Sequence, residues 1–125
     1  MDDFKVCDSP RECRERFNEY NKDGMETQVT ISDWATRTFG YPKSLKVSID
    51  RMLDEVEELK KLDYKSSEAN FDKVADECAD IYITMCQVMN VMGYNLHACV
   101  NHKMQINRAR KWKLKGDGTG QHIKE

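Results

Sequence analysis

Two stretches of the chain carry apolar residues at helical spacing, and this periodicity limits the fold more than any other feature. From Ser44 to Leu62, apolar side chains recur every three or four residues, which places them on one face of a helix. A second stretch runs from about Glu68 to Met92 and ends at Gly93. Strand-like alternation is confined to residues 28–31, a segment too short to matter. The pattern therefore predicts an all-α protein.

Helix caps and breakers predict three shorter helices. A serine or asparagine suited to N-capping precedes each of them, and glycines follow the first two. The predicted ranges are 10–21, Asp33–Phe39 and 96–112, with Ser9, Ser32 and Asn95 as their N-caps.

The length of 125 residues supports one domain with one modest core. We expect residues 1–125 to form that single domain, with residues 1–31 as an N-terminal extension and residues 113–125 as an irregular, glycine-rich tail. A charged content of 34%, a hydrophobic content of 39% and only two prolines suit a soluble helical protein.

Two acidic pairs, one on each long helix, suggest a metal-binding site. Glu55 and Glu58 are three residues apart, as are Glu77 and Asp80. On a helix this spacing puts both carboxylates on one face, with Cβ atoms about 5–6 Å apart, so that the like charges repel. Two such helices packed antiparallel would gather four carboxylates around a hard cation such as Mg²⁺.

The spacing of the acidic pairs is weak evidence by itself. With 22 acidic residues, about four such pairs are expected by chance, and a solvated helix face is the ordinary explanation of a run such as DEVEELKK. The neighbours favour a site, because Glu55 and Glu77 each have apolar residues at positions i−3 and i+4. Both carboxylates therefore share a stripe with residues that face a core, and buried carboxylates need partners.

The last predicted helix carries the opposite charge. No Asp or Glu occurs from Ile81 to Gly116. The inward stripe of this helix begins apolar and continues as Lys103 and Asn107, with Arg110 and Lys111 one turn further on. Phosphate binding and snorkelling of long side chains toward water both fit this stripe. Nucleic-acid binding fits less well, because the net charge is −2.

Several classes of protein are disfavoured by the composition. Five cysteines without an apolar leader indicate reduced thiols and a cytoplasmic location. No cysteine or histidine spacing matches a zinc site, and no apolar run approaches the roughly 20 residues of a membrane span. From Ile81 to Met92, however, apolar residues surround the helix, more than a lone small domain can bury. We therefore expect at least a homodimer.

The residues described so far resemble those of a known family. The pattern Glu55-x-x-Glu58, then Glu77-x-x-Asp80, then a helix with Lys and Asn is similar to that of the MazG-type all-α nucleoside triphosphate pyrophosphohydrolases. The stretches WATRTFGYPKSLKVSIDRMLDEVEEL and NRARKWKLKGDGTGQHIK more narrowly resemble the phage branch that acts on dATP and dGTP, which includes the MazZ-type enzymes. Together the matching stretches cover most of Ser32–Lys124.

This resemblance implies a MazG-like helical bundle, assembled as a homodimer or homotetramer, that cleaves a deoxynucleoside triphosphate between its α- and β-phosphates. It implies Mg²⁺, with Mn²⁺ as a substitute, and no nucleic-acid or membrane partner. The implied metal ligands are Glu55, Glu58, Glu77 and Asp80; the implied catalytic residues are Glu58 as general base, Glu55 and Lys103; the implied substrate-binding residues are Trp34, Lys103, Asn107, Arg110 and Lys111.

Two other functions remain open at this point. A house-cleaning enzyme of the all-α dUTP or dCTP pyrophosphatase type would use the same carboxylates. A non-catalytic oligomeric adaptor would explain the amphipathic helices but not the carboxylates in apolar stripes. A di-iron bundle is disfavoured, because it requires Glu-x-x-His pairs that the sequence lacks.

Overall fold

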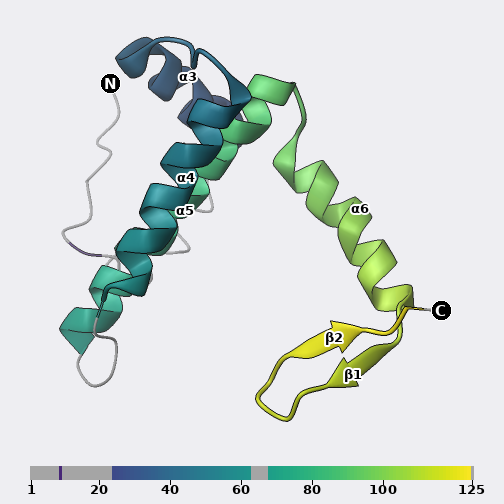
Figure 1. Ribbon diagram of the computed structural model, residues 1–125. Coiled ribbons are helices and arrows are strands. Elements are labelled where there is room, and N and C mark those ends of the chain that lie inside the picture. Colours follow the sequence, from purple (N-terminus) through teal and green to yellow (C-terminus); the bar gives the residue numbers. More distant parts are fainter. Residues whose placement is uncertain (1–8, 10–23, 63–67, 125) are drawn as a thin grey trace. The chain divides into compact units, whose positions relative to one another are not determined.

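The computed structural model describes Ser9 and residues 24–62 and 68–124 (Figure 1). The chain divides into two compact units, Met1–Gly93 and Tyr94–Glu125. The described part is mostly helical, as predicted, and also contains one short β-hairpin. The helix predicted after Ser9, the loop at 63–66 and the cap at Ser67 lie outside the described residues. The single-domain organisation stays a prediction.

Three helices build the described part of the first unit: α3 (Gln28–Phe39), α4 (Leu45–Lys60) and α5 (Glu68–Met92). Helix α5 packs against both α4 and α3, and α4 and α5 lie side by side and run in opposite directions (Figure 1). The bounds of α4 and α5 agree with the sequence prediction. The Ser44 Oγ caps α4 by accepting a hydrogen bond from the Val47 N–H at 3.2 Å.

The start of α3 differs from the prediction, which placed it at Asp33 with Ser32 as N-cap. Thr27 is the N-cap, in a reciprocal arrangement with Thr30: the Thr30 N–H donates to Thr27 Oγ1 at 3.2 Å, and the Thr27 N–H donates to Thr30 Oγ1 at 2.8 Å. Ser32 is therefore buried inside the helix. The helix ends as expected at Gly40, whose φ of +81° suits glycine.

The second unit consists of α6 (Leu96–Ala109) and a hairpin of β1 (Trp112–Leu114) and β2 (Gly120–His122). Asn95 caps α6 as predicted, but the helix ends before Trp112, because the backbone turns extended at Arg110. The prediction of an irregular tail at residues 113–125 was wrong. Strands β1 and β2 pair antiparallel, with Trp112 opposite His122.

The core of the first unit is thin. Among the described residues, the buried apolar ones are Ile31, Ala35, Cys86 and Val88. These residues lie on α3 and α5, the two helices whose packing they hold. None of the described helices combines the length and the hydropathy that a membrane crossing requires.

Candidate metal centre

Three of the four predicted carboxylates converge where α4 and α5 pack together. Oxygens of Glu55, Glu77 and Asp80 all lie within 4.8 Å of one another. The Glu55 side chain is only 17% exposed, Glu77 is half-buried and Asp80 is exposed. The convergence follows from the antiparallel pairing of two helices that carry acidic residues at matching heights.

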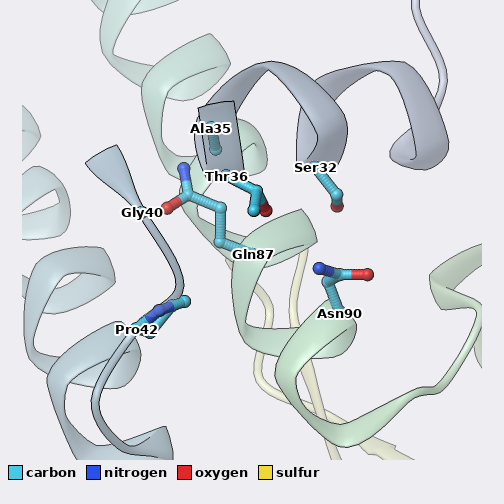
Figure 2. A pocket seen from close by; sticks show the side chains of 7 residues that line it. All are labelled: Ser32, Ala35, Thr36, Gly40, Pro42, Gln87 and Asn90. Carbon is cyan, nitrogen blue, oxygen red and sulfur yellow. The ribbon is translucent and has the colours of Figure 1, made fainter. Parts of the chain in front are cut away.

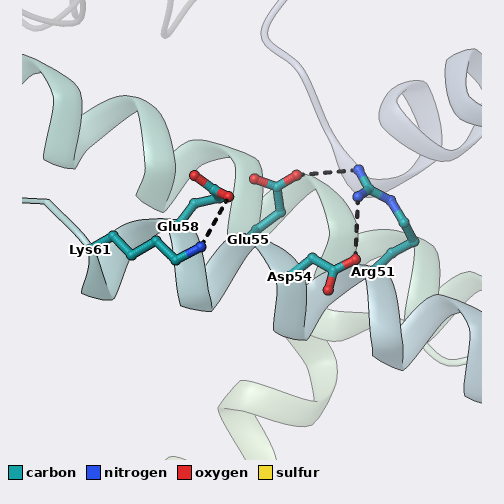
Figure 3. Close-up of polar contacts among 5 residues, drawn as sticks. All are labelled: Arg51, Asp54, Glu55, Glu58 and Lys61. Atoms are coloured by element: carbon teal, nitrogen blue, oxygen red, sulfur yellow. Dashed lines mark hydrogen bonds and ion pairs between the residues drawn. The ribbon is translucent and has the colours of Figure 1, made fainter.

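Glu58, the fourth predicted ligand, lies at the edge of this group and not within it. Its side chain is 59% exposed, and its Oε1 lies 4.0 Å from the Lys61 Nζ (Figure 3). The charge of Glu58 nevertheless contributes to the raised pKa of Glu77. Glu58 is therefore close enough to act on the cluster, in a position where water screens it.

Glu77 is the carboxylate of the cluster whose charged form is most disfavoured by its surroundings. Burial raises its pKa above the ordinary value of 4.5, and the negative charges of Asp80, Glu55 and Glu58 raise it further. The Glu77 Oε2 is shielded from solvent and has no hydrogen-bond partner among the described residues. A shielded carboxylate oxygen without a donor, surrounded by other carboxylates, is the environment that a bound cation would satisfy.

The donor set of the cluster matches a hard divalent cation. All three converging side chains offer carboxylate oxygens, which suit Mg²⁺ and Mn²⁺ better than the softer metals that prefer nitrogen or sulfur. The free cysteine nearest in sequence, Cys78, is exposed and does not belong to the group. The residues present therefore fit the metal that the sequence resemblance implies.

Arg51 is a functional candidate that sequence reasoning missed. Its guanidinium donates to Glu55 Oε1 at 3.2 Å and lies 3.7 Å from Asp54 Oδ2 (Figure 3). The spacing of four residues from Arg51 to Glu55 on α4 was a signal that could have found it. Arg51 holds the Glu55 carboxylate by one oxygen, and so it partly compensates the negative charge of the cluster.

The predicted phosphate-binding residues all belong to the second unit. Lys103 is exposed on α6, and Asn107 and Arg110 are half-buried. The Asn107 carbonyl accepts a hydrogen bond from the Trp112 Nε1 at 2.9 Å, which fixes the start of β1 against the end of α6. These residues and Lys111 are placed within their own unit only, and their role toward the carboxylates stays a prediction.

Trp34 borders a pocket between α3 and α5. Its side chain is 52% exposed, and its ring meets that of Phe39 edge to face, with 5.4 Å between centroids. The pocket has a volume of about 470 Å³, and its other lining residues are mostly apolar. They are Glu26, Ile31, Ala79, Tyr82 and Ile83.

A second, much smaller cavity lies where the end of α3 and the following turn meet α5 (Figure 2). Its volume of about 10 Å³ is the space that one water molecule needs. The buried Ser32 Oγ, which has no hydrogen-bond partner among the described residues, lines it together with Gln87 and Asn90. This cavity is too small for a substrate.

Comparisons with known proteins bear on the fold and on the sequence resemblance. No family model matches the chain. A dATP/dGTP diphosphohydrolase of Salmonella phage PMBT28 is 29% identical over 122 residues, which are 97% of this chain and 39% of that protein. The chain thus spans well under half the length of this relative. A solved structure of a MazG-like pyrophosphohydrolase from cyanophage S-2L, bound to dGDP and three catalytic Mn²⁺ ions per active site, matches with a TM-score of 0.62 at 24% identity. The match covers 78% of this chain and 90% of the cyanophage chain.

The fold is MazG-like. Both comparisons agree with the resemblance that the acidic pairs and the flanking motifs indicated, and the MazG-like structure confirms the predicted helical fold.

Proposed function

We propose that this chain is a metal-dependent pyrophosphohydrolase that converts dGTP and dATP to the monophosphate and pyrophosphate. The observation that carries the proposal is the convergence of Glu55, Glu77 and Asp80 within 4.8 Å on two adjacent helices. The MazG-like fold supports the reaction type, and the name of the phage relative supports purine deoxynucleotides. The substrates would belong to the nucleotide pool of an infected host's cytoplasm.

The metal would be held by Glu55, Glu77 and Asp80, with Glu58 beside them. When bound, a divalent cation, Mg²⁺ or Mn²⁺, neutralises charge on a triphosphate and lowers the pKa of a water molecule. The shielded Glu77 oxygen, which has no other partner among the described residues, supports this assignment. Glu55 would be oriented by its hydrogen bond from Arg51.

The remaining residues would handle protons and phosphates. Glu58 is our candidate for the general base, because its exposed carboxylate lies at the edge of the cluster and makes a long ion pair with Lys61. Lys103, Asn107 and Arg110, with Lys111, would bind phosphate oxygens and stabilise charge on the departing pyrophosphate. Base stacking by Trp34 stays a prediction.

We further propose that the chain works as a homodimer or homotetramer. The thin core leaves large apolar side chains on α3 and α5 at the surface; Trp34 is 52%, Tyr82 49% and Met92 42% exposed. Burial of such side chains between subunits is favourable. Sedimentation velocity at micromolar concentration should give a species of at least twice 14.6 kDa, and a purely monomeric profile would refute this assembly.

A substrate panel tests the activity. With Mg²⁺, the full chain should release the monophosphate and pyrophosphate from dGTP and dATP in one cleavage, resolved by ion-exchange chromatography. Release of a diphosphate and orthophosphate would overturn the proposal. A preference for dUTP or dCTP would overturn only the purine assignment, and an absence of both turnover and metal-dependent thermal stabilisation would favour a non-catalytic adaptor.

A further inference from the structure

The carboxylate cluster lies at one end of two polar stripes, one on α4 and one on α5. Each helix carries four polar side chains separated by three, four and three residues, a spacing that keeps them on one face. Because the helices run in opposite directions, the acidic end of one stripe lies beside the acidic end of the other. The stripes are Ser48, Arg51, Glu55 and Glu58 on α4, and Glu77, Asp80, Thr84 and Gln87 on α5.

The non-acidic ends of the two stripes line a pocket of about 430 Å³, which we call the donor pocket. This volume is within the range of small-molecule sites. Two exposed aromatic residues border it, Phe39 at the end of α3 and Tyr41 in the turn that follows, as does Lys43. No acidic residue lines the pocket in the described part of the chain. The donor-pocket residues are Phe39, Gly40, Tyr41, Pro42, Lys43, Val47, Ser48, Arg51, Thr84 and Gln87.

The polar groups of the donor pocket are only partly satisfied. Ser48 is 5% exposed, and its Oγ has no hydrogen-bond partner among the described residues. Thr84 is 7% exposed and donates to the Ile81 carbonyl at 2.9 Å, which leaves its oxygen able to accept a further bond. A buried hydroxyl without a partner costs free energy unless a ligand or water pairs with it.

Arg51 connects the donor pocket to the carboxylate cluster. It lines the donor pocket and also donates to Glu55 at 3.2 Å. A molecule whose phosphates lie against the carboxylate-held cation would therefore extend its remaining part past Arg51 into this pocket.

We propose that the donor pocket is the nucleobase subsite of the active site, an inference that rests on the proposed function. The rings of Phe39 and Tyr41 would contact the face of the base. The Ser48 hydroxyl and the Gln87 amide would bond to its edge. An amide offers both a donor and an acceptor. Gln87 can therefore pair with the 6-oxo group of guanine or the 6-amino group of adenine, so that one side chain would serve both purines of the proposed function.

The pocket beside Trp34 is a poorer subsite. It shares no lining residue with the polar stripes of α4 and α5, and its lining includes the Glu26 carboxylate and no cation among the described residues. Trp34 instead contacts Phe39. In this proposal Trp34 would orient Phe39 at one wall of the donor pocket, in place of the base stacking predicted from the sequence.

Two variants test the subsite in the full-length chain. Tyr41→Ala removes an exposed ring. Gln87→Met keeps the side-chain length but removes the amide that would form hydrogen bonds with the base. Each should weaken the binding of dGMP and of dAMP, measured by calorimetry with Mg²⁺, about tenfold. The KM for dGTP should rise with kcat nearly unchanged, and Mn²⁺ binding, followed by electron paramagnetic resonance, should stay the same. Phe71→Ala, an exposed aromatic on α5 outside the pocket, is the matched control and should alter none of these.

Three outcomes would overturn the subsite. Nucleotide affinity that falls with Trp34→Ala more than with Tyr41→Ala and Gln87→Met would place the base in the other pocket, while the proposed function would stand. Variants that change the sedimentation profile but not dGMP affinity would make this face a contact between subunits. An absence of dGMP binding to the wild-type protein at millimolar concentration would refute the nucleobase subsite. If the protein binds dGMP but releases no pyrophosphate, only the proposed function fails, and the binding data alone decide the subsite.

Discussion

The α4–α5 pair and the α6–hairpin unit carry the two charged halves of the predicted site under different structural conditions. In the helix pair, the packing of α4 against α5 brings Glu55, Glu77 and Asp80 together. In the second unit, Lys103 lies exposed on α6, and the contact of the Trp112 indole with the Asn107 carbonyl is internal to the unit. A charge pattern read from sequence can therefore be checked within one chain only where a second element faces it.

The largest effect that this comparison predicts is at Asp80. Asp80→Asn keeps the shape of the side chain but removes a charged ligand from the cluster, and pyrophosphate release at fixed Mg²⁺ should fall more than about 100-fold. Asp76→Asn, which alters an exposed acid of α5 outside the cluster, should leave turnover close to wild type. Equal effects of the two changes would show that the cluster is no special site.

A second, smaller effect should come from α6. Lys103→Ala removes a cation proposed to stabilise the leaving pyrophosphate, and kcat should fall about 100-fold, as when one donor to developing charge is lost. Lys113→Ala, on the exposed strand β1, is the control. Normal turnover of the Lys103 variant would confine the chemistry to the helix pair and leave the α6 stripe as a solvated surface.

Most helix bounds could be predicted because local signals and packing agree. Ser44 and Asn95 cap the helices they were expected to cap, and Gly93 ends α5. The start of α3 was missed because Thr27 and Thr30 cap each other through short side chains in a β-branched stretch, which propensity alone does not favour as helix.

The hairpin was missed because its strands are too short to show alternation. Each strand has three residues, and its turn depends on Gly116 and Gly118 at positive φ, with the Asp117 carboxylate accepting from Thr119. The glycines were visible in the sequence, but they indicated a turn without indicating what it joins.

The site could be predicted in part, for a physical reason. Carboxylates in apolar stripes are costly and therefore informative, which is why Glu55 and Glu77 could be recognised. Ser48 and Gln87 are uncharged, so their burial is less costly and they were not singled out in the sequence; the structure places them in one pocket with Arg51. The 3-4-3 spacing shared by both helices was the signal that could have found them.

The smallest predicted effect concerns the stability of the metal-free protein. Since the pKa of Glu77 is raised above its ordinary value of 4.5, the folded state binds this proton more tightly than the unfolded chain. Protonation of Glu77 therefore stabilises the folded state. This stabilisation is complete below the pKa that Glu77 has in the unfolded chain, and it is lost as the pH rises through the higher pKa of Glu77 in the folded protein. Glu77→Gln stays neutral at every pH, so without metal it should melt above wild type at pH 7, and the difference should shrink as the pH falls toward 4. Glu57→Gln, an exposed acid 3.7 Å from Lys60, should show no such gain.

Saturating Mg²⁺ should reverse the order of the two melting temperatures at pH 7, because only the wild type retains the full ligand set and gains stability by binding the metal. A metal-free variant that melts below wild type at pH 7 would mean that the Glu77 carboxylate is already satisfied, and the strongest reason for placing a cation beside it would be lost.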